Sequence, residues 1–405
     1  MSTTIKSQPF IPIILGGNLG SYSTARSFYE AYKVTSLILC TLVTGPINHS
    51  IFIKPIVEPK MMEPETLFRR LKEIDTQYPE SKKIVLSSTD NLVELMINHK
   101  EDFPEGWIVP YVDKDVFYRS TNKASFYAIC EEIGVPYPKT LVINDYEENL
   151  PFDFPIIIKP TDSMKFHAIE YPGKEKVYIC KDAATYKKII HDMKANGYDA
   201  DIVLQEYIPG DDSLVGVATV YSSHKTGEVK VVSFGQTLLE DHTPSAIGNH
   251  LVILTRKEDQ IVRDVKKLVK ATSWTGFSNF DVKFDTRDQT YKFFELNARL
   301  GRSNYYVTAA GKNTAEYYVK DFIENTPIEF SVADEEILYS AVPKRLLLQN
   351  LSSKEDIQKV RQLYRAHKVY HPLRSKDETN IKRKLYVNMA TMNYFKKFKN
   401  YPQPR

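Results

Sequence analysis

The stretch 279-NFDVKFDTRDQTYKFFELNAR-299 decides the fold, because it reads as two strands of alternating character around a polar turn. In each half, apolar side chains alternate with charged or amide side chains. Since successive side chains along a strand point to opposite faces, Glu295, Asn297 and Arg299 share one face. The polar segment 286–290 suits the loop of a hairpin.

The register of this hairpin follows from its length. If the turn is symmetric about Asp288, Asp281 lies opposite Glu295 and Val282 lies opposite Phe294. Directly opposed side chains are about 5 Å apart, and like charges there destabilise the pair. A cation must therefore offset the repulsion between the two carboxylates.

Asp281, Glu295 and Asn297 form a candidate metal site. Two carboxylates and an amide are hard oxygen ligands of the kind that suit Mg²⁺ bound to a nucleotide phosphate. The alternative is structural, with one carboxylate facing solvent or pairing with Lys283 or Arg299.

Two further strands end in residues that suit a nucleotide. The run 156-III-158 ends in Lys159, which places a lysine at the exit of a buried strand. The run 202-IVL-204 continues as 205-QEYIPGDD-212, which resembles a hinge between domains. Backbone groups near Glu206 to Ile208 suit hydrogen bonds to adenine, and an aspartate suits the ribose hydroxyls. Each feature is commonplace alone, but their order along the chain is specific.

The first part of the chain alternates between strands and helices. This alternation predicts a small doubly wound α/β domain. The loop 16-GGNLGS-21 lacks the spacing of a dinucleotide fingerprint and reads as a tight strand-to-helix turn. The expected strands are 11–15, 34–39 and 83–87, and the expected helices are 23–32 and 91–99.

The middle and the tail of the chain have less regular patterns. After the strand at 155–159, we expect a polar loop at 161–165 and then a hairpin at 166–179 that turns at Gly173. The tail predicts one amphipathic helix, which Ser353 caps.

Composition excludes several classes of protein. The 405 residues suit two or three domains, and 42% hydrophobic residues exclude a disordered chain. Three scattered cysteines argue against a disulfide framework or a thiolate metal site, and they fit a reducing cytosol. No secretory signal, membrane span, P-loop, nucleophile elbow or zincin helix is visible. We therefore expect a cytoplasmic protein without a transmembrane segment.

The charge is distributed unevenly. Residues 344–405 carry 16 Lys and Arg against 4 Asp and Glu, although the whole chain has a net charge of only +3. A basic appendage on an acidic body indicates an anionic partner, either an acceptor substrate or, transiently, an anionic membrane surface. The alternative for any one cluster, such as Lys382-Arg383-Lys384, is a solvated helical face.

These features, taken in order, resemble the ATP-grasp superfamily. The resemblance rests on Lys123, on Ile-Ile-Lys159-Pro, on the segment 205–212, and on the hairpin motifs Asn-Phe-Asp281 and Phe-Glu295-Leu-Asn297-Ala-Arg299. Within the superfamily, the chain is most similar to bacterial D-aspartate ligases over residues 10–325. That similarity rests on 10-FIPIILG-16, 122-NKASFY-127, 135-VPYPKT-140, 238-LLEDHTPSAIGN-249 and 301-GRS-303.

The resemblance implies a role for each matching position. Many relatives have a glycine-rich lid loop where this chain has Thr161-Asp162-Ser163-Met164-Lys165, and D-aspartate ligases share the glycine-poor form. The implied contacts are Lys123 and Lys159 at the nucleotide phosphates, Ser163 and Lys165 in the lid, Glu206, Tyr207 and Ile208 at adenine, Asp212 (or Asp211) at ribose, Asp281, Glu295 and Asn297 at Mg²⁺, and Arg299 at the transferred phosphoryl group.

Arg302 is a candidate for substrate recognition. It follows Arg299 by three residues, past Gly301, so that a second guanidinium can face the pocket. A planar guanidinium fits the second carboxylate of an aspartate in a bidentate pair. The alternative is a surface or helix-cap residue.

The implied fold is α/β (α+β) in four parts. We expect a Rossmann-like pre-ATP-grasp domain at 1–121, a lid subdomain at 122–205, an Mg²⁺ and ATP subdomain at 206–330, and a basic helical extension at 331–405.

The implied reaction is amide formation through an acyl-phosphate, with ATP and Mg²⁺. The preferred reading joins the β-carboxyl of D-aspartate to the lysine ε-amine of an anionic peptidoglycan precursor, with no nucleic-acid partner. A ligase for another amino acid or peptide, or a nucleotide-binding regulatory protein without turnover, are the alternatives. Asp241 and His242 are candidates for the base that takes the amine proton, although a structural turn at 242–244 is preferred.

Overall fold

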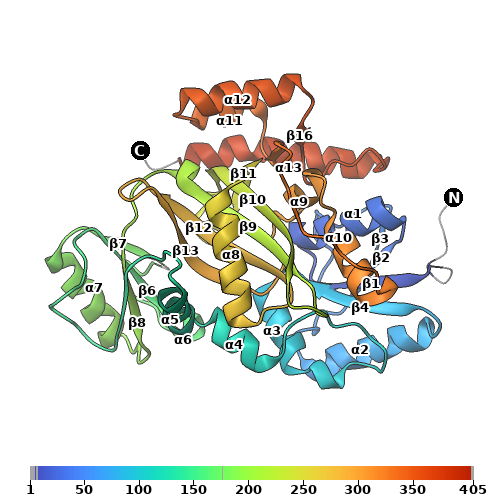
Figure 1. The fold of residues 1–405 in the computed structure, drawn as a ribbon, viewed down its shortest axis with the longest axis horizontal. Helices are drawn as coiled ribbons and strands as arrows, with labels where there is room; N and C mark the ends of the chain where they lie inside the picture. Colours follow the sequence, from blue (N-terminus) through green and yellow to red (C-terminus); the bar gives the residue numbers. More distant parts are fainter. Residues whose placement is uncertain (1–4, 6–7, 176, 403–405) are drawn as a thin grey trace.

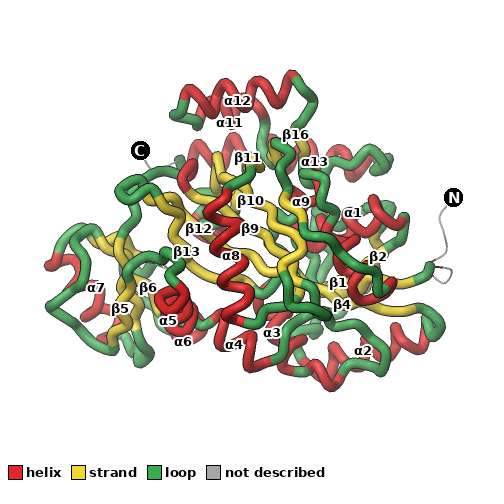
Figure 2. The backbone as a smooth tube through the Cα atoms, in the orientation of Figure 1, coloured by secondary structure: helices red, strands yellow, loops and turns green. Residues whose placement is uncertain are grey.

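The structure is a computed structural model that describes residue 5 and residues 8–175 and 177–402. Three sheets organise the molecule, and each is made by a different stretch of the chain. Figure 1 shows the largest sheet in the centre, with the N-terminal sheet on the right and the smallest sheet on the left. In Figure 2, helices cover the outer faces of this row of strands.

The N-terminal sheet is parallel and has the strand order β3-β2-β1-β4. Its strands are β1 (Phe10–Leu15), β2 (Ser36–Cys40), β3 (Ile53–Val57) and β4 (Lys82–Ser87), and its helices are α1 (Leu19–Tyr32), α2 (Pro64–Gln77) and α3 (Asp90–Asn98). Parallel strands joined by helices confirm the expected α/β arrangement. Helix α1 begins earlier than expected because the Asn18 side chain caps it by accepting from the Ser21 N–H.

The smallest sheet is antiparallel, with the order β5-β8-β6-β7. Its elements are β5 (Thr140–Ile143), β6 (Ile156–Pro160), α6 (Ser163–Ala168), β7 (Tyr178–Cys180), α7 (Ala183–Ala195) and β8 (Ile202–Glu206). Residues 140–206, called the lid unit below, enclose a hydrophobic core of their own around Ile158, Tyr186 and Leu204.

The expected hairpin at 166–179 is wrong. Asp162 caps α6 by accepting from the Lys165 N–H at 2.9 Å, so the polar run becomes the start of a helix. Phe166 then lies buried in the core of the lid unit, and only residues 178–180 form a strand.

The central sheet has the order β13-β12-β9-β10-β11-β15-β16, and β14 pairs with β10. The strands are β9 (Val215–Ser222), β10 (Val229–Glu240), β11 (His250–Arg256), β12 (Gly276–Asp285), β13 (Thr290–Asn297), β14 (Ser331–Val332), β15 (Leu338–Ser340) and β16 (Val369–Tyr370). Helix α8 (Asp259–Thr272) lies across this sheet in Figure 1, and its buried side chains Ile261, Val265 and Leu268 share a core with β9 and β10.

The remaining helices connect the sheets and cover their edges. Asn122 caps α5 and Gly134 ends it in the left-handed conformation, as the sequence predicts. The elements are α4 (Lys114–Thr121), α5 (Lys123–Ile133), α9 (Tyr305–Ala309), α10 (Thr314–Tyr318), the 3₁₀ turns η2 (Lys100–Asp102), η3 (Asp212–Leu214) and η4 (Pro244–Ala246), and the π-helical turn η5 (Val319–Glu324).

The C-terminal segment contributes both strands and helices. It adds β14, β15 and β16 to the central sheet, and it forms α11 (Lys344–Asn350), α12 (Lys354–Arg365) and α13 (Ile381–Asn400). Ser353 caps α12, as expected. Within the described residues 8–175 and 177–402, no helix combines the length and the apolar character that a membrane span requires.

Helix α13 was not predicted from the sequence. Its apolar side chains face both the core and the solvent, so they form no single stripe: Val387 and Phe398 are buried, while Leu385 and Met389 are exposed. The predicted basic cluster also differs. Arg383 is buried, and only its neighbours Lys382 and Lys384 are exposed.

Candidate active site

The hairpin of β12 and β13 places the two predicted carboxylates opposite each other. Asp281 pairs with Glu295, as predicted, but Val282 pairs with Phe293 and not with Phe294. A β-bulge at Phe294 shifts the register by one residue. The backbone carbonyl of Phe294 instead accepts from the Tyr127 hydroxyl of α5 at 2.8 Å.

The two carboxylates have different surroundings. The Lys123 ammonium lies 3.1 Å from Glu295 and lowers the pKa of that carboxyl. Burial, followed by the charge of Glu295, raises the pKa of Asp281 well above its usual value. Asn297 donates to Asp281 at 3.0 Å. The two carboxyls therefore differ in acidity, and the charged form of Asp281 is the less favourable one.

This donor set fits Mg²⁺. Two facing carboxylates and an amide oxygen are hard ligands, and a cation between the carboxylates would offset the repulsion that raises the pKa of Asp281. The alternative pairing with Lys283 or Arg299 does not occur. Lys283 donates to the Gly210 carbonyl at 3.0 Å, and Arg299 pairs with Asp90 at the start of α3.

Lys159 extends from the end of β6 toward this hairpin. Its ammonium donates to the Gln205 side chain at 3.3 Å and lies 5.7 Å from the centre of the Phe294 ring. The bulge places Phe294 and Glu295 next to each other on the half-buried side of β13, so Lys159 and Lys123 approach the same region. Helix α5, which begins at Lys123, and strand β6, which contains Lys159, thus bring two lysines to one carboxylate pair.

The predicted adenine segment joins the lid unit to the central sheet. The Glu206 carboxylate accepts from the Lys139 N–H at 2.8 Å and from Arg287 at 3.0 Å. Ile208 is buried, and Tyr207 lies 5.6 Å below the Lys283 ammonium. The side chain of Glu206 therefore holds the hinge together.

Asp212 lies at the start of η3, in a cluster of titratable groups. Its carboxylate accepts from the Glu240 N–H at 2.8 Å and lies 2.9 Å from the His242 ring nitrogen. Burial, with the charge of Asp212 second, raises the pKa of Glu240 to about 7. Asp241 pairs with Lys397 of α13 at 2.8 Å, so both candidate bases, Asp241 and His242, make structural contacts.

The predicted lid contacts lie in α6. The Lys165 ammonium pairs with Asp199, within the lid unit, at 3.0 Å. The side chain of Ser163 lies outside the part of the chain that is described. The structure therefore does not bring Lys165 to the carboxylate pair.

The two arginines beyond β13 have different positions. Arg299 donates to Asp90, at the start of α3, at 2.8 Å, and its second contact is Asn297 at 3.5 Å. Arg302 is exposed overall, yet it lines a small cavity next to the carboxylate pair. The cavity has a volume of about 100 Å³, and its polar lining includes Asn249, His250, Asn279, Asp281, Asn297, Arg299, Arg302, Ser303 and Tyr394.

The comparison with curated proteins identifies the family. The chain is 33% identical to the D-aspartate ligase of Enterococcus faecium (strain Aus0004) over an alignment of 419 residues, which covers 99% of each chain. The chain belongs to the D-aspartate ligase family. No family model matches it.

Solved structures similar to this member of the D-aspartate ligase family show the ATP-grasp fold. N5-carboxyaminoimidazole synthetase from Staphylococcus aureus complexed with ADP has a TM-score of 0.58 and 11% identity, covering 83% of this chain and 84% of that one. The L-amino acid ligase from Bacillus licheniformis has a TM-score of 0.54 and 13% identity, covering 80% and 76%. The chain is thus an ATP-dependent carboxylate–amine ligase that uses ATP with Mg²⁺.

Some residues of the site in this D-aspartate ligase family member carry no sequence signal. Asp90, Tyr127, Arg287 and Tyr394 come from four separate segments and join the site only through folding. Asp90 and Arg299 are 209 positions apart, and nothing in the spacing of either residue predicts their contact.

Proposed function

We propose that this ligase activates the β-carboxyl of D-aspartate and joins it to the lysine ε-amine of a peptidoglycan precursor. The observation that carries the proposal is the small cavity that brings Arg302 next to Asp281, Asn297 and Arg299. One carboxylate of an aspartate can reach the phosphate end of this cavity while Arg302 holds the other. The relative named D-aspartate ligase supports this choice of donor.

The nucleotide occupies the space between the lid unit and the central sheet in this proposal. Lys123 and Lys159 contact its phosphates, with Ser163 and Lys165 of α6 reaching it when the lid unit approaches. The backbone of Glu206, Tyr207 and Ile208 recognises adenine, and Asp212 or Asp211 recognises ribose. Support comes from two lysines that converge on one carboxylate pair beside the hinge.

Asp281, Glu295 and Asn297 hold Mg²⁺ in this proposal. The cation neutralises charge on the phosphate oxygens during transfer. Arg299, which Asp90 orients, stabilises the same charge from the protein side.

The reaction has two balanced steps. A β-carboxylate oxygen attacks the γ-phosphorus, the bond from that phosphorus to the ADP oxygen breaks, and ADP leaves. The neutral amine then attacks the acyl carbon, a C–N bond forms, the C–O bond to phosphate breaks, and phosphate leaves with the electron pair. The amine nitrogen loses its proton to water or to the departing phosphate.

The first experiment measures ATP-dependent phosphate release with a panel of amino acids and with hydroxylamine, which traps an acyl-phosphate as a hydroxamate. D-Aspartate should give hydroxamate far faster than D-alanine, D-asparagine or L-aspartate. Arg302→Lys should raise the KM for aspartate about tenfold and leave the KM for ATP unchanged, because a lysine cannot reproduce the bidentate pair. Equal use of D-alanine would contradict the proposed donor.

We also propose a cellular location for the protein and a division of the chain into four parts. Cytoplasmic location is supported by three cysteines that are all free and buried. The proposed parts are residues 1–121, the lid at 122–205, the Mg²⁺ and ATP part at 206–330 and the extension at 331–405, whose strands join the central sheet.

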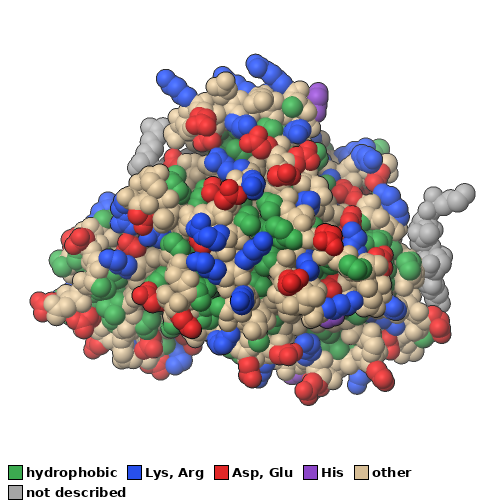
Figure 3. Space-filling model, viewed as in Figure 1, with side chains coloured by type: hydrophobic (Ala, Val, Ile, Leu, Met, Phe, Trp, Pro, Cys, Tyr) green, Lys and Arg blue, Asp and Glu red, His purple; other side chains and the backbone are tan. Residues whose placement is uncertain are grey.

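Contact with an anionic membrane surface is a further part of the proposal. Its support is an exposed stripe on α13, formed by Ile381, Leu385, Met389 and Met392, on a helix that carries six Lys and Arg and no acidic residue. Figure 3 shows further basic side chains projecting at the top of the molecule, where Figure 1 places α11 and α12. The protein should sediment with vesicles that contain phosphatidylglycerol and lose this binding in high salt. Equal sedimentation with neutral vesicles would contradict it.

A further inference from the structure

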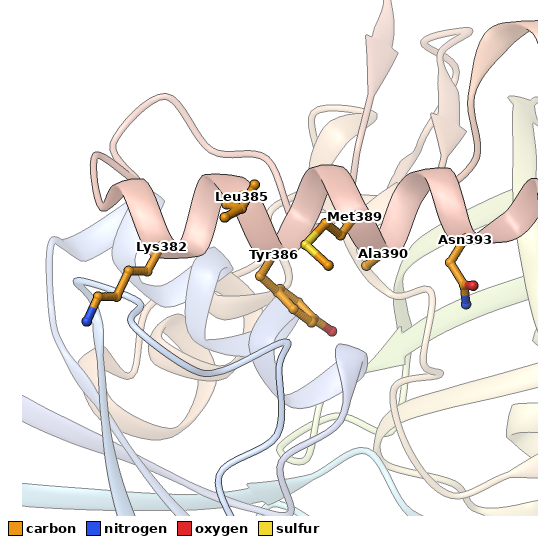
Figure 4. Close-up of a pocket in the computed structure, with 6 residues that line it drawn as sticks. All are labelled: Lys382, Leu385, Tyr386, Met389, Ala390 and Asn393. Atoms are coloured by element: carbon orange, nitrogen blue, oxygen red, sulfur yellow. The ribbon is translucent and has the colours of Figure 1, made fainter.

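Three cavities lie in a row between the carboxylate pair and the surface of α13. The inner one is the cavity of about 100 Å³ that contains Asp281 and Arg302. The middle one has a volume of about 180 Å³ and the outer one is an open groove of about 600 Å³. The outer groove runs along one side of α13, and Figure 4 shows Lys382, Tyr386 and Asn393 extending from that side of the helix.

The three cavities are adjacent, because neighbouring cavities share lining residues. The inner and middle cavities share Leu19, Arg302, Ala341 and Tyr394. The middle cavity and the outer groove share Tyr386, Ala390 and Asn393. Together they form a row of hollows from the carboxylate pair to the surface, called the channel below.

The wall that α13 forms is fixed in place. Arg383 of α13 donates to the Pro46 and Asn48 carbonyls of the N-terminal sheet's loops, at 2.8 and 3.0 Å. A Cβ atom at Gly45 would lie about 2.1 Å from the Tyr386 ring, so only glycine permits this close approach. On the other side, Lys397 pairs with Asp241 after β10. The helix therefore spans the N-terminal and central sheets and closes the channel between them.

The lining of the channel favours an anionic ligand. Among the described residues, no acidic side chain lines the middle cavity or the outer groove, whereas Lys382 and Arg302 lie at their two ends and Lys397, which pairs with Asp241, lies between them. Apolar side chains such as Leu19, Leu373 and Leu385 provide contact for a hydrocarbon chain.

We propose that this channel binds the acceptor, an anionic peptide that carries a primary amine on a flexible chain. Its carboxylates lie along α13, and its amine-bearing chain passes through the middle cavity to reach the acyl-phosphate. The proposal rests on the proposed function and adds the acceptor site to it. The C-terminal helix is thus a part of the substrate-binding surface, although it lies far from the carboxylate pair in the sequence.

Two asparagines of α13 allow a matched experiment. Asn393 lines the channel, whereas Asn388 is exposed on the same helix and lines none of the three cavities. Asn393→Trp fills the junction of the middle cavity and the outer groove, and Asn388→Trp adds the same side chain elsewhere. Each variant is assayed for aspartyl hydroxamate formation with hydroxylamine, and for transfer to a peptidoglycan stem pentapeptide with a free lysine ε-amine.

Asn393→Trp should raise the KM for the pentapeptide at least about tenfold and leave hydroxamate formation within about twofold of the wild type. Asn388→Trp should change neither. Unchanged transfer in Asn393→Trp, or an equal fall of both activities in a folded protein, would overturn the channel. Absence of hydroxamate in the wild type would instead contradict the proposed function.

A charge at the same positions tests the channel without filling it. Asn393→Glu should raise the KM for the pentapeptide, and the increase should shrink in high salt, because it places a negative charge where the middle cavity and the outer groove meet, next to basic lining residues. Asn388→Glu is the control. If Asn388→Glu has the same effect as Asn393→Glu, the ligand responds to the net charge of the helix and the channel is overturned.

Discussion

Asp281 and Glu295 face each other in one hairpin, but their immediate neighbours shift the pKa values of the two carboxyls in opposite directions. Lys123 lies beside Glu295 and lowers the pKa of that carboxyl, whereas burial next to Glu295 raises the pKa of Asp281. Substitution of each residue by its amide should therefore have different effects on stability, although both carboxylates belong to the proposed metal site.

Asp281→Asn should raise the free energy of unfolding of the metal-free protein by up to about 1 kcal/mol, because a neutral amide replaces a carboxyl whose charged form is disfavoured by burial and by Glu295. Glu295→Gln should lower it, because Lys123 then has no carboxylate partner. Both variants should lose roughly 100-fold or more of ATP turnover. Urea unfolding without Mg²⁺ and phosphate release with Mg²⁺ check these outcomes. Near-normal turnover of Glu295→Gln at saturating Mg²⁺ would end the metal assignment.

The titration of Glu240 should make the free energy of unfolding depend on pH. Its pKa in the folded protein is about 7, above the ordinary value of 4.5, so the folded state binds more protons than the unfolded state between these values. Its contribution to stability is present below about pH 4.5 and is lost as the pH rises through 7. The groups that face it are Asp212, His242, His250 and Lys283.

Glu240→Gln should remove this dependence. Between pH 5 and pH 8, the free energy of unfolding of the wild type should fall by about 2 to 3 kcal/mol more than that of the variant. Urea unfolding at both pH values measures the difference. Parallel pH profiles for the two proteins would show that Glu240 is not the group responsible.

At the scale of elements, a buried ion pair holds α13 against the N-terminal sheet. Arg383 lies 3.0 Å from Glu378, and both side chains are almost completely buried. Glu378 also accepts from the Tyr22 and Ser50 hydroxyls, and the Arg383 guanidinium lies 4.2 Å from the centre of the Tyr22 ring. Removal of one partner leaves the other as a buried, unpaired charge.

Arg383→Met should lower the free energy of unfolding by about 3 to 5 kcal/mol. The double variant with Glu378→Gln should lose less than the sum of the two single variants, with a coupling of about 1 to 3 kcal/mol. Lys384→Met, at the exposed neighbouring position, serves as the control and should change it by less than about 0.5 kcal/mol. Additive effects in denaturant unfolding would contradict the pairing.

At the scale of the whole molecule, the lid unit is a body with its own core. Side chains that link it to the rest include Gln205, which donates to the Tyr127 hydroxyl, and Glu206, which accepts from Arg287. A unit with a separate core and a small, polar interface moves relative to its neighbours. A nucleotide held between the lid unit and the central sheet should restrict this motion.

ATP with Mg²⁺ should therefore slow hydrogen exchange of amides in β6 and α6, and leave the amides of the N-terminal sheet unchanged. Lys159→Met should weaken the protection, since it removes a contact from β6 to the phosphates. Mass spectrometry of peptides from both regions measures the effect. Equal protection of both regions would indicate global stabilisation and contradict lid closure.

The sequence by itself determined the features that depend on local order. The alternation of side chains along 279–299 predicted the opposition of Asp281 and Glu295, and the short capping patterns at Asn122 and Ser353 predicted the starts of two helices. These features depend on neighbouring residues and on the two-residue period of a strand, so they can be predicted from the sequence alone.

Only the tertiary structure decided the rest. The bulge at Phe294 depends on Tyr127, the orientation of Arg299 depends on Asp90, and the burial of Arg383 depends on Glu378. The channel along α13 depends on three segments that meet only in the folded molecule. In each case the role of a side chain depends on a contact with residues that are distant in the sequence. Burial and charge pairing follow from proximity in space, so they leave no local pattern in the sequence.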